Sequence, residues 1–172
     1  KEYRRQRQMC IRDRFEPSSQ QEAYDMVYHG FELSEKLGYP ILLRVTTRMA
    51  HSRAGVVTSP LKPENRMNCP EDGRQRFILL PALARKRFKS LLASQEAFTE
   101  ASENSAYNKY FDAPNKDLGI ITTGIAFNYL SENYPDGFEH PVLKISQYPL
   151  PRKQVEKIVG ECKEILVLEE GY

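Results

Sequence analysis

Residues 118–168 read LGIITTGIAFNYLSENYPDGFEHPVLKISQYPLPRKQVEKIVGECKEILVL, and short apolar runs alternate in this stretch with longer amphipathic ones. Apolar runs bounded by turn residues predict three β-strands, over residues 118–124, 142–145 and 165–168. Helical patterns lie between them, over residues 126–134 and after Pro151. The order β-α-β-α-β predicts a parallel sheet with right-handed crossovers.

A second unit of the same class precedes this one. Ser19 and Glu22 have the spacing of a capping box, and Gly38 is suited to end the helix predicted over residues 19–37. The apolar, β-branched run at residues 41–47 predicts a strand covered on both faces. The expected fold class is therefore α/β, with a parallel-sheet αβ unit followed by the β-α-β-α-β unit.

The middle of the chain is less regular. Residues 55–76 are rich in loop-forming residues and predict the boundary between the two units. A helix is predicted to resume at Ala82, with an apolar stripe that reaches Phe98. Its other faces carry Arg85, Lys86, Arg87 and Lys89. This basic run favours a solvated helix face or an interdomain contact, while phosphate or RNA binding is the alternative.

Composition restricts the class of protein. The 172 residues carry a formal net charge of +2. Residues 1–14 hold six basic and two acidic residues, a net of +4, so the remaining residues sum to −2. We expect this basic leader to be disordered or non-native and exclude it from the fold. No apolar run approaches the roughly 20 residues of a membrane helix, and three scattered cysteines form no disulfide or metal framework. We expect a cytoplasmic protein without nucleic-acid or membrane partners.

Polar side chains are concentrated at the carboxyl end of the strand predicted at residues 41–47 and just beyond it. They are Arg44, Thr46, Thr47, Arg48, His51 and Ser52. Such donors at a strand end could bind a carboxylate or phosphate, and His51 could transfer protons. The structural alternative is that Arg48 pairs with an acid and His51 caps the loop. No acid completes a catalytic triad nearby, and no metal site is predicted.

Several strings, taken in order, resemble a known family. They are SQQEAYDM at residues 19–26, FELSEKLG at 31–38, LLRVTTRMAHS at 42–52, LGIITTGI at 118–125 and YPLP at 148–151. Over roughly residues 15–172 the chain resembles the alpha subunit of indolepyruvate:ferredoxin oxidoreductase, a thiamine diphosphate-dependent 2-oxoacid:ferredoxin oxidoreductase. The resemblance implies the end of a pyrimidine-binding-like domain at residues 15–60, a loop and connecting helix at 61–117, and a truncated domain resembling the transketolase C-terminal domain at 118–172.

The resemblance also implies a reaction. An aryl 2-oxoacid such as indolepyruvate is oxidatively decarboxylated to acyl-CoA, with ferredoxin as the acceptor. The full-length enzyme would use thiamine diphosphate with Mg²⁺ and 4Fe-4S clusters. Its implied partners are the remainder of the alpha subunit, a beta subunit, ferredoxin and coenzyme A.

The chain lacks the main motifs of that family. The glutamate that activates thiamine lies upstream in the family, the Gly-Asp-Gly motif lies downstream, and the cysteine-rich tail is missing here. We therefore expect an internal fragment that is inactive alone, binds none of these cofactors by itself, and leaves the catalytic residues outside the chain. Thr46, Thr47, Arg48, His51 and Ser52 are the candidates for an active-site or interface segment. The alternatives are a fragment that uses pyruvate or another 2-oxoacid, and a non-catalytic α/β interaction module.

Overall fold

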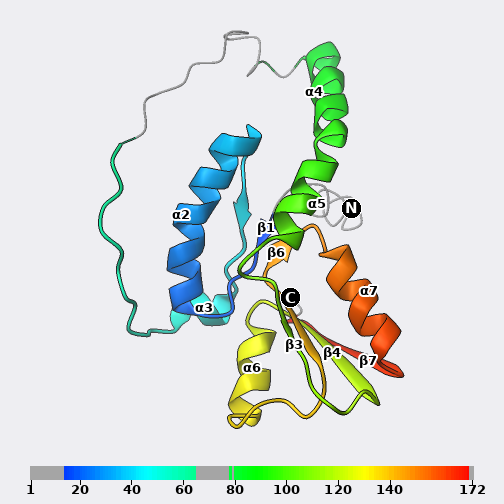
Figure 1. Ribbon diagram of the computed structural model, residues 1–172. Helices are drawn as coiled ribbons and strands as arrows, with labels where there is room; N and C mark the ends of the chain where they lie inside the picture. Colours follow the sequence, from blue (N-terminus) through cyan, green and yellow to red (C-terminus); the bar gives the residue numbers. More distant parts are fainter. Residues whose placement is uncertain (1–13, 65–77, 79, 171–172) are drawn as a thin grey trace.

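The computed structural model describes residues 14–64, 78 and 80–170, which form two small sheets and the helices around them (Figure 1). The first sheet has the strand order β2-β1-β6 and the second the order β3-β5-β4-β7. The strands are β1 (Arg14–Phe15), β2 (Leu42–Leu43), β3 (Lys109–Phe111), β4 (Leu118–Thr123), β5 (Val142–Ile145), β6 (Gln147–Tyr148) and β7 (Glu164–Leu168). The helices are α2 (Gln20–Leu37), α3 (Thr47–His51), α4 (Pro81–Ala93), α5 (Gln95–Glu103), α6 (Ala126–Asn133) and α7 (Arg152–Glu161).

The second sheet confirms the α/β prediction for the C-terminal third. Strands β5, β4 and β7 are parallel neighbours, with α6 and α7 between them in the chain. Val142, Leu143 and Ile145 of β5 are almost fully buried, because this strand lies inside the sheet and is covered on both faces. Strand β3 was not predicted, and it adds an antiparallel partner to the outer edge of β5.

Two glycines of this unit have different physical roles. A Cβ on Gly119 would lie 2.9 Å from side-chain atoms of Cys162, Ile158 and Ile165, so this glycine allows β4 to pack closely against α7 and β7. Gly124 ends β4 with φ +50, a conformation that favours glycine.

Helix α2 forms as its caps predict. The side chain of Ser19 accepts a hydrogen bond from the backbone N–H of Glu22, and Gly38 ends the helix with φ 70. The reciprocal half of the predicted capping box is different, because the Glu22 carboxylate accepts from the N–H and hydroxyl of Ser18 instead of the N–H of Ser19.

The prediction of a covered strand over residues 41–47 was wrong. Only Leu42 and Leu43 pair, in parallel with β1, and β2 is the edge of its sheet. The side chain of Leu42 is 46% exposed. The chain leaves the strand because Thr46 caps the short helix α3, accepting from the N–H of Met49.

The helix predicted from Ala82 is in fact two helices, α4 and α5, separated at Ser94. Its apolar stripe is also not a continuous buried face. Phe98 in α5 is fully buried, whereas Phe88 and Leu92 in α4 are 52% and 49% exposed. The i, i+4 pattern therefore indicated the helix correctly but not its burial.

Strand β6 connects the two sheets. It follows β5 after the single residue Ser146 and pairs antiparallel with β1, so that Arg14 lies opposite Tyr148. Arg14, assigned to the leader from the sequence, is therefore part of the fold, while residues 1–13 lie outside the described residues. The division at residues 15–60, 61–117 and 118–172 stays a prediction. Within the described ranges, every helix is too short or too polar to cross a membrane.

Candidate functional site

The predicted polar segment folds around the single turn of α3. The side chain of Thr46 accepts from the N–H of Met49, and the Ser52 hydroxyl donates to the Met49 carbonyl over 3.0 Å. The Gln20 side chain donates to Ser52. Thr46 and Ser52 thus hold the two ends of α3, and Ser52 also ties it to the start of α2.

Arg48 and His51 lie on the outside of this turn and are exposed, as is Thr47. The Arg48 guanidinium lies 5.0 Å from the centre of the Tyr129 ring in α6, which places α3 against the C-terminal unit. Among the residues that the structure describes, no acid pairs with Arg48. The structure therefore leaves Thr47, Arg48 and His51 as available donors, and their role stays a prediction.

Arg44, grouped with this segment from the sequence, belongs to another cluster. Its guanidinium donates to Glu16 over 2.9 Å, and Arg14 contacts the same carboxylate oxygen at 3.1 Å. Glu16 is only 4% exposed. Arg14 also lies 4.1 Å from the ring centre of Tyr148. Burial, followed by the charge of Glu16, raises the pKa of Tyr148 to about 12.

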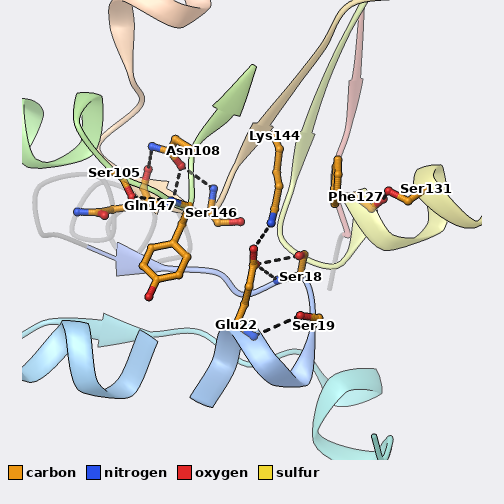
Figure 2. A network of polar contacts seen from close by, with 11 residues as sticks. Ser18, Ser19, Glu22, Ser105, Asn108, Phe127, Ser131, Lys144, Ser146 and Gln147 are labelled. Carbon is orange, nitrogen blue, oxygen red and sulfur yellow. Dashed lines mark hydrogen bonds and ion pairs between the residues drawn. The ribbon is translucent and has the colours of Figure 1, made fainter. Parts of the chain in front are cut away.

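A buried ion pair joins the two units (Figure 2). Lys144 of β5 has a side chain only 3% exposed, and its ammonium pairs with the Glu22 carboxylate of α2. The other Glu22 oxygen accepts from the N–H and hydroxyl of Ser18 at 2.9 and 2.8 Å. The ammonium also lies 4.9 Å from the Phe127 ring centre. Burial lowers the pKa of Lys144, and the negative charge of Glu22 opposes that shift.

Asn108 organises the connection between β5 and β6 (Figure 2). Its side-chain oxygen accepts from the N–H groups of Ser146 and Gln147 at 2.8 and 2.9 Å. Its side-chain nitrogen donates to the carbonyls of Gln147 and Ser102 at 2.9 and 3.0 Å. The buried amide therefore replaces ladder partners at the point where the chain passes from one sheet to the other.

Glu16, Lys144 and Asn108 were all missed by the sequence interpretation. Lys144 offered one signal, since a lysine within an apolar run expected to be buried requires a partner. For Glu16 and Asn108, the partners are set by tertiary contacts that leave no local pattern.

The described residues do not provide a metal or cluster site. Within the ranges 14–64 and 80–170, no three His, Cys, Asp or Glu side chains are grouped so that they could hold a metal ion. Cys162 is a free, half-buried cysteine, and burial raises the pKa of its thiol. Cys10 and Cys69 lie outside the described residues. The described chain is thus an α/β segment with three paired polar clusters and one open donor segment at residues 47–51.

Comparison with known proteins identifies relatives of this chain. Indolepyruvate oxidoreductase subunit IorA from Methanothermobacter thermautotrophicus is 37% identical over 163 residues, which cover 90% of this chain and 26% of that protein. The subunits IorA from Archaeoglobus fulgidus and Pyrococcus abyssi are 38% and 36% identical, each over 90% of this chain and 25% of their own length. The resemblance seen in the sequence is confirmed, and the chain is homologous to part of this subunit.

The chain spans about a quarter of the length of these curated relatives. No family model matches it. Among solved structures, 2-oxoglutarate:ferredoxin oxidoreductase from Magnetococcus marinus aligns with a TM-score of 0.41 and 17% identity, over 55% of this chain and 17% of that one.

Proposed function

We propose that this chain is a segment of the alpha subunit of an indolepyruvate:ferredoxin oxidoreductase. The whole enzyme would oxidatively decarboxylate aryl 2-oxoacids to acyl-CoA and pass the electrons to ferredoxin. The observation that supports this proposal is the 36–38% identity to three IorA subunits over nine-tenths of the chain. The chain would act only together with the remainder of the alpha subunit and a beta subunit.

The cofactors of this function are thiamine diphosphate with Mg²⁺ and 4Fe-4S clusters. The described residues do not fit them, because they offer neither a metal-ligating group nor a set of cysteines. We therefore assign no residue of this chain to these cofactors. In calorimetry, the 172-residue chain is expected to show no binding of thiamine diphosphate, and a micromolar dissociation constant would contradict the proposal.

Thr46, Thr47, Arg48, His51 and Ser52 are proposed to lie near the active site or a subunit interface. Support comes from the exposure of Thr47, Arg48 and His51 on a turn that Thr46 and Ser52 hold in place. The turn also contacts the C-terminal unit through Arg48. A rigid turn that presents donors is suited to orient an anionic group.

A segment exchange tests the function. Residues 15–172 would replace the matching part of IorA from M. thermautotrophicus, and the chimera would be produced with its beta subunit. The expected result is ferredoxin reduction that depends on indolepyruvate and coenzyme A. A chimera that assembles but prefers pyruvate would support the pyruvate alternative, and one that assembles without activity on any 2-oxoacid would contradict the proposal.

The same chimera tests the donor segment. Arg48→Ala is expected to lower turnover at least about tenfold without lowering the thermal midpoint, because Arg48 lies on the surface and covers one aromatic ring. Arg152→Ala, an exposed arginine at the start of α7, is the matched control and is expected to leave turnover unchanged. Equal kinetics of the two variants would remove Arg48 from the proposed site.

A further inference from the structure

Helix α3 presents exposed donors but has only weak directional support of its own. The Arg48 guanidinium lies over the Tyr129 ring of α6, and Arg48 is exposed, where a cation–π contact contributes little. Met49 of α3 is buried, but apolar packing has no preferred direction. The orientation of α3 must therefore be set largely by the element to which it is hydrogen-bonded.

That element is the first turn of α2. The side chain of Gln20, the first residue of α2, donates to the hydroxyl of Ser52 at the end of α3. Glu22 lies in the same first turn, whose backbone is held by the Ser19 cap. A displacement of this turn is therefore passed on to α3.

The first turn of α2 is in turn fixed on the C-terminal unit by Glu22 (Figure 2). One oxygen of its carboxylate pairs with Lys144 of β5, and the other accepts from the N–H and hydroxyl of Ser18. The Lys144 ammonium also lies 4.9 Å from the ring centre of Phe127, which precedes Tyr129 by two residues in α6. The ion pair thus joins α2, β5 and α6 beside the helix that α3 touches.

Stability alone does not explain a charged pair at this place. Lys144 is only 3% exposed and lies in a strand whose other residues are apolar. Replacing a buried ion pair by apolar side chains of similar volume is often neutral or stabilising. A hydrogen-bonded ion pair differs from an apolar contact in its geometric specificity, because it is favourable in a narrow range of orientations. The pair is therefore suited to fix an orientation.

We propose that Glu22 and Lys144 are positioning residues, which orient the donors of α3 relative to the C-terminal unit. The ion pair fixes the first turn of α2, and the hydrogen bond from Gln20 to Ser52 transmits that constraint to α3. Arg48 is thereby presented in one orientation. This inference rests on the proposed function, because it takes α3 to lie near the active site or a subunit interface of the whole enzyme.

A distance measurement on the 172-residue chain tests the positioning without any activity. Spin labels at Ala50→Cys of α3 and Glu156→Cys of α7, both exposed positions, report the distance by pulsed electron paramagnetic resonance. The chain's own cysteines are first replaced by alanine. Glu22→Gln combined with Lys144→Met keeps the size of both side chains and leaves no unpaired buried charge. This neutral pair should broaden the distance distribution, because α3 loses its fixed orientation while the chain stays folded.

Turnover of the chimera with M. thermautotrophicus IorA tests whether the positioning acts through Arg48. The neutral pair and Arg48→Ala should each lower turnover at least about tenfold, because a small displacement of an orienting group is enough for such a loss. The variant that combines them should be no slower than the slower of the two, since both changes remove the same oriented donor. A combined loss of about a hundredfold would show independent effects and would overturn the proposal.

Gly119→Ala is the control for destabilisation alone. Its Cβ has no room beside Ile158 and Cys162 of the α7 side, and the alternation of side chains along β4 places it on the face of the sheet opposite to Lys144. It should leave both the distance distribution and the turnover unchanged. If it broadens the distribution as much as the neutral pair does, loss of stability explains the effect and the positioning role is refuted.

The two measurements separate this inference from the proposed function. A chimera that assembles but acts on no 2-oxoacid contradicts the function, whereas the distance distribution still decides the positioning role. A distribution that is the same in wild type and neutral pair overturns the positioning role, even in an active chimera. A broadened distribution with unchanged turnover also overturns it, because the orientation of α3 would then have no effect on the reaction.

Discussion

Replacing Glu22 by glutamine tests the ion pair that joins α2 to β5. The substitution keeps the shape of the side chain and an acceptor for Ser18, but it leaves the Lys144 ammonium without its counter-charge. Removing one partner of a buried ion pair costs about 3–5 kcal/mol. Glu22 is 16% exposed and Lys144 only 3%, so we expect the lower end, a loss of about 3 kcal/mol. Urea denaturation at constant m-value measures the loss.

Substitution of the other partner, Lys144, separates the cost of an unpaired buried charge from the cost of lost side-chain contacts. Lys144→Met removes the buried cation, while Glu22 keeps both hydrogen bonds from Ser18. We expect a smaller loss, about 1 kcal/mol, and a double variant that is less destabilised than the sum of the single ones by about 2 kcal/mol. A loss below about 0.5 kcal/mol for Glu22→Gln, or additive effects in the double variant, would refute the reasoning.

The pH dependence of this pair has a definite sign. Burial lowers the pKa of Lys144 in the folded state, so the unfolded chain binds more protons between the lowered pKa and the usual value. The contribution of Lys144 to the free energy of unfolding therefore rises with pH through that window. In Glu22→Gln the attraction that opposes the shift is gone, so the pKa of Lys144 falls further. The deficit of this variant in the free energy of unfolding should therefore shrink as the pH rises through this range toward the usual pKa of lysine. A deficit that grows over this range would contradict the assignment.

Three further outcomes follow from packing and burial. Asn108→Ala should lower the free energy of unfolding by about 3 kcal/mol in urea denaturation, because it leaves two buried N–H groups of the β5–β6 connection without acceptors. Gly119→Ala should lower the free energy of unfolding by about 1–3 kcal/mol, because the added Cβ has no room. Gly160→Ala is the control and should be neutral or stabilising, since there is open space around Gly160. Equal effects of the two substitutions would refute the packing argument. Tyr148, whose pKa is raised to about 12, should ionise above the usual range in a titration at 295 nm, and since the folded state retains its proton longer, stability should fall from about pH 10 to about pH 12.

The C-terminal third could be predicted from the sequence because its signals are local. Each of β4, β5 and β7 is a short apolar run, and each helix between them has its own stripe and terminal proline or turn. Strands β1, β3 and β6 were missed because two or three residues are too few to show the alternating hydrophobic pattern of a strand. These strands are defined only by the hydrogen bonds to their neighbouring strands. The same reason explains the overlong strand at residues 41–47, where pairing stops after Leu43.

For the candidate site, the sequence could indicate which polar residues gather in the segment, but not which contacts each of them makes. Thr46 and Ser52 proved to be hydrogen-bonded ends of α3, and Arg44 proved to pair with the buried Glu16. Helix periodicity also could not show that Phe88 faces water, because an apolar stripe has the same pattern whether its partner lies within the chain or outside it.

Strand β6 has a consequence for how this protein can be dissected. Because residues 142–148 run through both sheets with only Ser146 between β5 and β6, a displacement of one sheet is transmitted to the other. An N-terminal piece separated after residue 64 would hold β1 with β2 alone, and a two-stranded sheet of this length does not persist in water. The two units should therefore melt in one transition, and proteolytic cleavage between residues 64 and 78 should release no N-terminal piece that stays folded by itself.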